Sequence, residues 1–353
     1  MKNKLYSIQL IRFIAVFLVV LVHCIDRMSR YFDAPEHIFS FYYFDVFGRA
    51  GVDIFFVISG FVMMYISNKA ITENTFNLKV FLIKRALRVI PIYWLITGII
   101  SMLLIFYPSV FYNTTTDVFH TLGSYFFIPI ASPDGKFAPL LGVGWTLNIE
   151  MFFYLIFGIF LFFKGQQASK FIFLFFCFTC SLGELFEIRD KSYFLNVLTN
   201  PMLFEFFLGM ILFKVLNIKS YSLLHVLFSL FISISLFSYT IFWEINTDFR
   251  FITWGGASFF LLFSLISLEK MGKLEVPNIF VLLGDASYSI YLTHYLVIGI
   301  MYKVGHKMGV LSFKSEFIIF TLFVSLILGY LFYLLIEKPL IKLLNKRVKI
   351  NYV

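Results

Sequence analysis

The sequence predicts an all-α fold, a polytopic membrane helix bundle, and three observations support this. Hydrophobic residues make up 60% of the 353 residues and charged residues only 14%, and the mean hydropathy is +0.88. An average soluble domain is about 45–50% apolar and about 25% charged. The chain also contains 50 Phe residues. A soluble fold would have to hide this apolar surface from water, whereas lipid-facing helices can leave it exposed.

A helix needs about 20 residues to cross the hydrocarbon core of a bilayer, and about ten apolar runs approach this length. The fifth run is short. The apolar segment 122–131 is shorter still and contains Pro129, with Pro133 just after it, so we expect a re-entrant or surface segment there. The expected spans are 7–25, 46–66, 89–107, 142–163, 171–184, 197–216, 221–242, 251–268, 281–303 and 316–336.

The distribution of basic residues predicts the orientation of the chain. With a cytoplasmic N-terminus, the inner segments carry about twice as many Lys and Arg residues as the outer loops, which agrees with the positive-inside rule. Both termini are then cytoplasmic, and residues 338–353 form a short basic tail. The same rule explains the net charge of +9, so we expect membrane lipids as partners and no nucleic acid. No linker interrupts residues 1–353, which predicts a single transmembrane domain.

The first expected span carries Arg12 and His23, and every residue between them is apolar. They are eleven residues apart, which places both on one helix face, about 16 Å apart along the axis. An ionisable group in a bilayer costs at least about 2.5–3.5 kcal/mol, so we expect a function for each. A guanidinium suits a phosphate or carboxylate, and an imidazole suits proton transfer near neutral pH. The structural alternative for His23 is a hydrogen bond to a neighbouring helix.

The second expected span contains an acid and a base that can pair. Arg49 and Asp53 are four residues apart, so they share a helix face. Gly51, Ser59 and Gly60 are small enough to let another helix backbone approach closely. Two interpretations stay open here, a structural ion pair at a packed helix crossing and a substrate-binding role for Asp53.

Two arginines precede the third expected span. Arg85 and Arg88 are three residues apart in a loop that we place at the cytoplasmic surface, and they would share a helical face. Two guanidinium groups at this spacing can hold a phosphate or pyrophosphate. The structural alternative is membrane anchoring by basic residues beside the aromatic pair Tyr93 and Trp94.

Further polar residues lie in the fourth and ninth expected spans. Trp145 and Glu150 begin the fourth span, near its outer end. In the ninth span, Ser287, Tyr291 and His294 fall on one helical stripe. A hydrogen bond between helices explains any one of these residues, but the whole intramembrane set favours a buried functional site. The ionisable members of that set are Arg12, His23, Asp53, Glu150, Glu205 and His294.

These residues belong to motifs that resemble the acyltransferase-3 family of integral membrane O-acyltransferases, in the same order and over nearly the whole chain. The chain resembles the stand-alone form of that family, without a C-terminal hydrolase-like domain. One departure is Gln9, since many members have an acidic residue three positions before the first-span arginine. The matching pieces are Arg12 with His23, Gly51–Phe61, Arg85 and Arg88 followed by Pro91 and Tyr93, Trp145–Glu150, and Ser287–His294.

The resemblance implies an acyltransferase, usually an acetyl-CoA-dependent O-acetyltransferase, in the bacterial inner membrane. Such an enzyme moves an acyl group from cytoplasmic acyl-CoA to a hydroxyl of a cell-surface or lipid-linked glycan such as O-antigen or exopolysaccharide. The donor is a co-substrate, and no spacing of His, Cys, Asp and Glu residues predicts a metal site.

On this hypothesis Arg85 and Arg88 bind the phosphates of acyl-CoA and Arg12 guides its long arm. His23 is the general base on the sugar hydroxyl, and Glu150 is the second catalytic residue. Direct attack on the thioester and transfer through an acyl group on His23 both remain open. We expect the substrate-binding residues to be Trp145, Tyr291, His294 and Asp53.

Two other classes of protein remain in competition. A transporter or flippase of glycan precursors or acyl groups also has about ten helices with buried charges, although no inverted repeat is visible here. A non-catalytic membrane scaffold or sensor would tolerate substitution of Arg12 and His23, whereas the enzyme would not.

Overall fold

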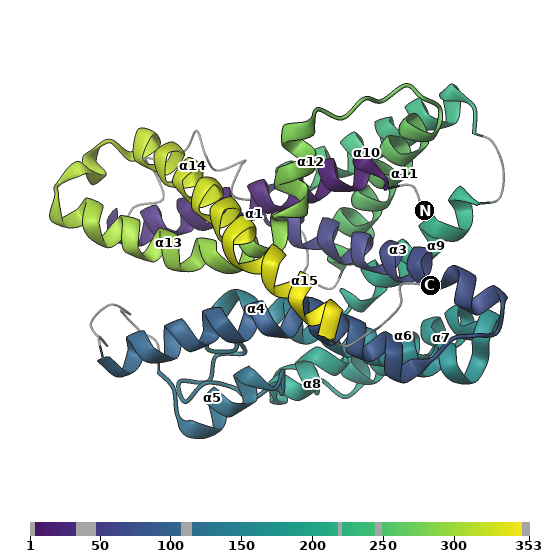
Figure 1. Ribbon diagram of the computed structural model, residues 1–353, viewed down its shortest axis with the longest axis horizontal. Coiled ribbons are helices and arrows are strands. Elements are labelled where there is room, and N and C mark those ends of the chain that lie inside the picture. The colour runs from purple at the N-terminus through teal and green to yellow at the C-terminus, as the bar shows by residue number, and fades with distance from the viewer. Residues whose placement is uncertain (1–3, 33–46, 107–114, 218–220, 244–248, 348–353) are drawn as a thin grey trace. The chain divides into compact units, whose positions relative to one another are not determined.

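The computed structural model describes residues 4–32, 47–106, 115–217, 221–243 and 249–347. Their regular secondary structure is helical, and no strand occurs among them (Figure 1). Eight helical segments of this described part are long and apolar enough to cross a membrane. The predicted all-α helix bundle is therefore confirmed, and the chain is a multi-pass membrane protein.

The chain divides into two compact units. Unit 1 comprises Met1–Met63 and Leu208–Leu334, and unit 2 comprises Met64–Phe207 and Leu335–Val353. Helices α3 (Ala50–Thr72) and α9 (Leu203–Leu216) and the π-helical turn η9 (Tyr333–Glu337) each contribute residues to both units.

Unit 1 is built around helix α1 (Tyr6–Phe32), which packs against α11, α12, α13 and α14. The middle of α1 is apolar on all sides, and Ile11, Ala15 and Val16 are fully buried. Helices α10 and α11 pack as a pair, as do α13 and α14. The bounds are α10 (Leu223–Phe242), the π-helical turn η7 (Phe251–Gly255), α11 (Gly256–Lys270), α12 (Asn278–Asp285), α13 (Ser287–Lys307), η8 (Val310–Ser312) and α14 (Lys314–Phe332).

Helices α1 and α3 cross closely at Gly51. A Cβ atom at this position would lie 2.5 Å from the Ala15 carbonyl oxygen, so a larger residue does not fit. At the next crossing, Gly209 of α9 lies against the backbone of Val57 and Gly60. The prediction that Gly51 and Gly60 permit close approach is confirmed, and the contact fixes α3 against the helix that carries His23.

The N-terminus of α1 is held by Glu269, at the end of α11. The backbone amides of Tyr6 and Ser7 donate to the two carboxylate oxygens at 2.7 and 2.8 Å, and the Ser7 hydroxyl also donates to this carboxylate. The first amides of a helix have no partner within it, and a negative charge there is also favoured by the helix dipole. Lys4 pairs with Asp285 at 2.7 Å beside this cap.

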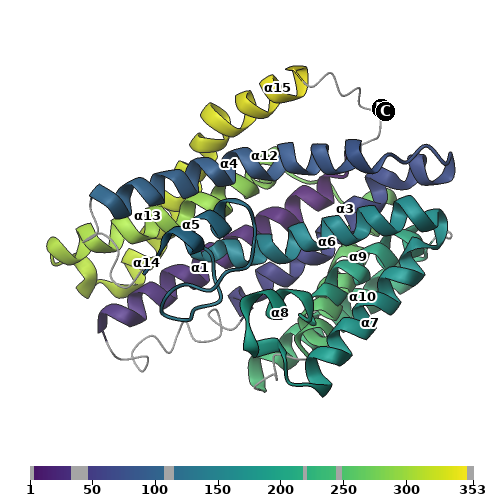
Figure 2. The same ribbon diagram turned by 90° about the horizontal axis from the view of Figure 1, so that it is seen from below.

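Unit 2 contains the helices that carry the arginine pair and Glu150 (Figure 2). Helix α6 packs against α4, α7 and α8, and Phe153 of α6 stacks on Phe206 at 4.3 Å. The bounds are α4 (Leu78–Phe106), α5 (Val118–Tyr125), η3 (Gly142–Gly144), α6 (Trp145–Lys164), η4 (Gly165–Gln167), α7 (Ala168–Leu185), η5 (Arg189–Lys191), α8 (Tyr193–Leu198), the π-helical turn η9 (Tyr333–Glu337) and α15 (Lys338–Arg347).

The sequence prediction placed the start of the third span too far along the chain. Helix α4 starts at Leu78 instead of residue 89, because Asn77 accepts a hydrogen bond from the Val80 amide at 3.0 Å and so caps the helix. The helix continues through Pro91. The expected loop around Arg85 and Arg88 is therefore wrong, since both side chains project from a helix.

Two other expected spans are divided. The span 197–216 is split into α8 and α9 at Pro201, which lacks an amide hydrogen and disfavours helix in the residue before it. The span 281–303 is split into α12 and α13 at Ala286, and α13, although 21 residues long, is not among the eight segments that are both long and apolar enough to cross a membrane. Helices α6 and α7 lie in one such segment, Gly142–Leu185.

Two further predictions concern segment 122–131 and the C-terminal tail, and the structure contains a helix in each part of the chain. The first contains only the end of α5, which is eight residues long and too short to span, as expected. Residues 338–347 of the expected basic tail form helix α15, which packs against α4.

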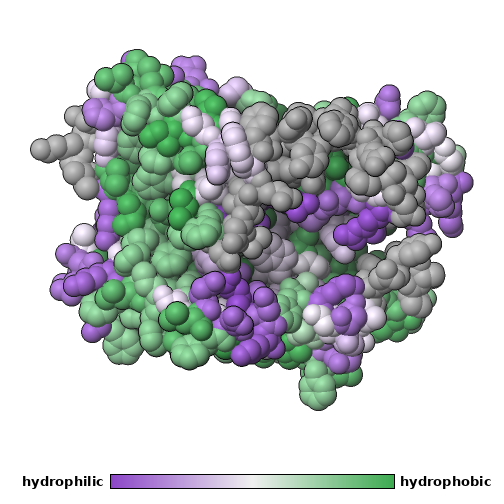
Figure 3. Space-filling model, turned by 180° about the vertical axis from the view of Figure 1, so that it is seen from behind, coloured by the Kyte–Doolittle hydropathy of each residue, from purple (hydrophilic) through white to green (hydrophobic). Residues whose placement is uncertain are grey.

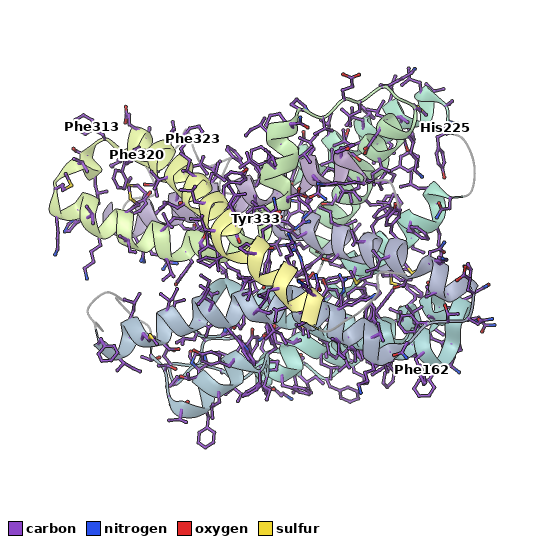
Figure 4. The ribbon with its side chains drawn as sticks, in the orientation of Figure 1. Phe162, His225, Phe313, Phe320, Phe323 and Tyr333 are labelled. Atoms are coloured by element: carbon purple, nitrogen blue, oxygen red, sulfur yellow. The ribbon has the colours of Figure 1, made fainter. Side chains whose placement is uncertain are left out.

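Apolar side chains cover much of the surface, as a lipid environment requires. Hydrophobic residues dominate large parts of the face drawn in Figure 3. Phe162 on α6 and Phe320 and Phe323 on α14 are more than half exposed, and all three project from their helices (Figure 4). Phe residues can remain exposed in this way where lipid takes the place of water.

Candidate active site

Helices α1 and α13 bring two histidines together in unit 1. The ring centroids of His23 and His294 are 5.2 Å apart. His294 is fully buried, and its Nδ1 lies 3.3 Å from the Ile290 carbonyl oxygen. Because a carbonyl only accepts, Nδ1 carries the proton and Nε2 of the neutral ring is an acceptor. Among the described residues this Nε2 atom has no hydrogen-bond partner. It can therefore accept a hydrogen bond from a substrate hydroxyl that lies next to His23.

Residues from three separate sequence motifs meet around His294. Tyr291, one turn earlier on α13, has its ring centroid 5.8 Å from that of His294, so these two residues of the predicted stripe lie together. Phe55 of α3 packs edge-on against Tyr291 at 6.0 Å. Ser287 begins the same helix, and its buried hydroxyl has no hydrogen-bond partner in the described parts of the chain. Helices α1, α3 and α13 therefore enclose His294 with a mixture of polar and aromatic side chains.

Arg12 lies on the same uninterrupted helix as His23, as the sequence predicts. Its Nη1 donates to the side-chain oxygen of Gln9 at 3.5 Å. Gln9, three positions before Arg12, thus still accepts a hydrogen bond from the arginine, although the Gln9 side chain carries no charge.

Asp53 is fully buried and is bound by Arg250. Nε and Nη2 of Arg250 donate to the two carboxylate oxygens at 2.8 and 2.7 Å. Nη2 also donates to the Arg49 carbonyl at 3.1 Å, and the guanidinium lies over the Trp254 ring at 4.5 Å. The sequence suggested Arg49 as the partner and missed Arg250, because no spacing links residues that are 197 positions apart. The bidentate geometry is that of a structural ion pair, but with Arg250 in place of the expected Arg49. A substrate-binding role for Asp53 stays a prediction.

In unit 2, Arg85 lies beside Glu150 and Tyr154. The Tyr154 hydroxyl donates to the Glu150 carboxylate at 2.5 Å, and Arg85 interacts electrostatically with both residues. In the described structure, the buried Nε of Arg85 has no hydrogen-bond partner. Sequence reasoning missed Tyr154, although its position one helical turn after Glu150 was a usable signal.

The sequence prediction separated Arg85, on the inner donor side, from Glu150, on the outer acceptor side. This separation is wrong, since both side chains belong to one cluster. The reason is the early start of α4, which places Arg85 seven residues inside the helix. Helix α6 packs along α4, so that Gly158 faces Phe81 and Gly144 faces Tyr93, and Glu150 falls between these two contacts.

Arg88, one turn after Arg85, forms an ion pair with Glu337. Its Nη1 lies 2.9 Å from the carboxylate, which is fully buried, whereas the Arg88 side chain is 35% exposed. Sequence spacing gave no signal for this pair, because Arg88 and Glu337 are 249 positions apart.

The remaining predictions concern Trp145 and metals. Trp145 begins α6 directly after η3 and is half-buried, and it belongs to unit 2, whereas Tyr291, His294 and Asp53 belong to unit 1. In the ranges described above, no three His, Cys, Asp or Glu side chains form a group that could hold a metal ion.

Comparison with known proteins identifies the family. The model of the acyltransferase-3 family, an acyltransferase domain, matches residues 5–337 and so includes residues of both units. The exopolysaccharide production protein ExoZ of Rhizobium meliloti (strain 1021) is 33% identical over 297 residues, which cover 84% of this chain and 90% of that protein. No solved structure matches the chain. With the family's motifs gathered around His23 and Arg85 in a multi-pass helical protein, the chain belongs to the acyltransferase-3 family and is a membrane acyltransferase.

Proposed function

We propose that this protein transfers an acetyl group from cytoplasmic acetyl-CoA to a hydroxyl of an exopolysaccharide or a lipid-linked precursor at the bacterial inner membrane. Family membership supports acyl transfer, and the printed name of the Rhizobium meliloti relative supports a polysaccharide acceptor. The observation that carries the proposal is the pairing of His23 with a buried His294 whose Nε2 is an open acceptor.

The donor site uses the arginines. Arg85 and Arg88 lie one turn apart on α4, and paired guanidinium groups bind phosphate oxygens well. Glu150 and Glu337 hold these two groups in place, so the CoA phosphates meet prepositioned side chains. Arg12 guides the arm of the donor, since it lies about 16 Å from His23 along α1, a distance that such an arm can reach.

The chemistry requires one base and one positioning group. The acceptor hydroxyl gives its proton to the His23 ring while its oxygen attacks the thioester carbonyl. The carbon–sulfur bond then breaks, and the departing CoA thiolate takes the proton from His23. The Nε2 atom of His294 accepts a hydrogen bond from a neighbouring hydroxyl of the same sugar and so orients the ring, which leaves the proton of the attacking hydroxyl for His23. General base catalysis of this kind contributes about 10²–10⁴-fold.

The transfer is direct, without an acyl group on His23. Purified protein given acetyl-CoA without glycan should therefore release no rapid stoichiometric burst of CoA. A burst equal to the enzyme concentration would instead show a covalent intermediate.

The test is mass spectrometry of the surface polysaccharide from cells that lack this protein and are complemented with variants. Wild type should restore the acetylated glycan and His23→Ala should not. His294→Gln should lower acetylation by about 10²-fold, the effect of a misplaced reactant. His225→Ala is the matched control, because His225 is an exposed histidine on α10 bound to Ser222.

Immunoblots should show equal amounts of each variant in the membrane. Full acetylation with His23→Ala would remove the base from the mechanism. A change in the amount of surface glycan without any change in its acetylation would favour the transporter interpretation.

A further inference from the structure

Three buried polar atoms in unit 2 are not used by the reaction proposed above. Tyr93 and Thr97 on α4 are fully buried, and Asn148 on α6 is almost so. In the part of the chain that the structure describes, the Tyr93 hydroxyl, the Thr97 hydroxyl and the Asn148 side-chain oxygen have no hydrogen-bond partner. Burial of polar atoms without partners costs free energy, and most buried polar atoms in proteins are paired. Three such atoms in one region are available to bind a polar ligand.

These atoms belong to one cluster. Tyr93 and Thr97 are one helical turn apart on α4, and their side-chain hydroxyls are close enough to interact with each other. The Asn148 amide donates to the Tyr193 hydroxyl at 2.9 Å, and Tyr193 interacts electrostatically with Tyr93. A Cβ atom on Gly144, at the start of α6, would lie 3.0 Å from the Tyr93 ring, so α4 and α6 are in contact at this level.

Aromatic rings flank the polar cluster. Tyr93 lies against Phe127 with ring centroids 4.6 Å apart, and Tyr193 stacks on Phe137 at 5.7 Å with an interplanar angle of 13°. Hydroxyl and amide groups beside aromatic faces suit a sugar ring, whose hydroxyls need hydrogen bonds and whose C–H faces pack on aromatic rings. None of the six side chains named for this cluster carries a formal charge at neutral pH, which favours an uncharged ring.

We propose that α4, α6 and α8 of unit 2 form a subsite for a neutral pyranose ring of the glycan. The Asn148 side-chain oxygen accepts from one sugar hydroxyl, and the Tyr93 and Thr97 hydroxyls bond to others. This inference rests on the proposed function, because the sugar belongs to the acceptor chain. Under the predicted orientation α4 runs outward, and these residues lie in its later half, on the side where an extracytoplasmic glycan arrives.

The experiment removes single oxygen atoms. Tyr93→Phe and Thr97→Val each delete one of the unpartnered hydroxyls and keep the rest of the side chain's shape. The probe is a set of neutral oligosaccharides cut from the surface polysaccharide of cells that lack this protein. Their binding to the full-length protein in detergent is measured by calorimetry without acetyl-CoA, beside the midpoint of thermal unfolding.

Each variant should bind the oligosaccharides about three- to tenfold more weakly, the effect of one lost hydrogen bond. The thermal midpoint of the free protein should stay unchanged or rise, because an unpaired buried hydroxyl has been removed. Thr179→Val is the matched control. The Thr179 hydroxyl is buried on α7 and donates to Phe176, so this variant should keep wild-type binding.

Wild-type affinity in both variants would overturn the subsite, as would a wild-type protein that binds none of the oligosaccharides. A lower thermal midpoint with unchanged affinity would also overturn it and would assign the cluster to ordered water. Because binding is measured without the donor, the two proposals fail separately. Saccharide binding without acetyl transfer would contradict only the proposed function, and acetyl transfer with unchanged variant affinities would contradict only the subsite.

Discussion

Two of the fully buried carboxylates in the described part of the chain are each held by an arginine that is distant in the sequence. Asp53 is bound by Arg250, and Glu337 by Arg88, and both acids are fully buried. The cost of removing such charges from water is large, so each carboxylate depends on its partner. Loss of one partner is therefore expected to affect stability more than loss of the pair.

The Arg88–Glu337 pair gives a test at this scale. Arg88→Ala leaves Glu337 charged and buried, so we expect a loss of about 2–3 kcal/mol in the free energy of unfolding. Glu337→Gln leaves Arg88, which is 35% exposed and can be hydrated, so its cost should be below about 1 kcal/mol. Denaturation of both variants in detergent measures the difference between their free energies of unfolding. Calorimetry with acetyl-CoA should show weaker binding for Arg88→Ala, and unchanged stability together with unchanged donor affinity would contradict both roles of Arg88.

The sequence predicted residues that are related by helix period and missed those related by tertiary contact. His23 and Arg12, or Tyr291 and His294, share a face because of their spacing alone. No such rule joins Asp53 to Arg250, since they belong to the two separate sequence segments that form unit 1. Sequence spacing likewise could not predict the contact between His23 and His294, because the two residues lie on different helices.

Helix boundaries were predicted less well than helices. Hydropathy indicates which residues suit lipid, but a helix begins and ends at caps and breakers. Asn77 starts α4 eleven residues before the apolar run, and Pro201 divides an apolar run that hydropathy treats as continuous. The correct position of Arg85 depends on this boundary.

The Glu269 cap gives a test at the scale of the element. Glu269→Gln should lower the free energy of unfolding by about 1–2 kcal/mol, because the amides of Tyr6 and Ser7 lose a charged acceptor at the start of α1. Glu275→Gln, at an exposed position in the following loop, is the control. Equal unfolding midpoints for the two variants would show that this cap does not stabilise α1.

In the whole molecule, the residues proposed to function in acyl transfer are divided between the two units. His23 belongs to unit 1, and Arg85 and Arg88 belong to unit 2. The family model matches residues of both, so acyl transfer should require both in one protein. That residues 1–353 act as a single domain remains a prediction.

The orientation of the molecule can be measured by labelling. Single cysteines at Lys136 and Lys191 should react with a membrane-impermeant maleimide in intact cells, because the positive-inside rule places both loops outside. Cysteines at Glu73 and Lys273 should react only after the membrane is opened. All four positions are exposed, so access to the side chain does not limit the reaction. The three native cysteines are replaced by alanine beforehand, and the opposite labelling pattern would invert the predicted topology.

The most direct test of acyl transfer uses purified protein, radiolabelled acetyl-CoA and unacetylated polysaccharide. Wild type should move the label onto the glycan. His23→Ala should lower the rate of transfer by about 10²–10⁴-fold and leave acetyl-CoA affinity unchanged, because the base is lost and the donor site is kept. Transfer by His23→Ala at the wild-type rate would contradict the account.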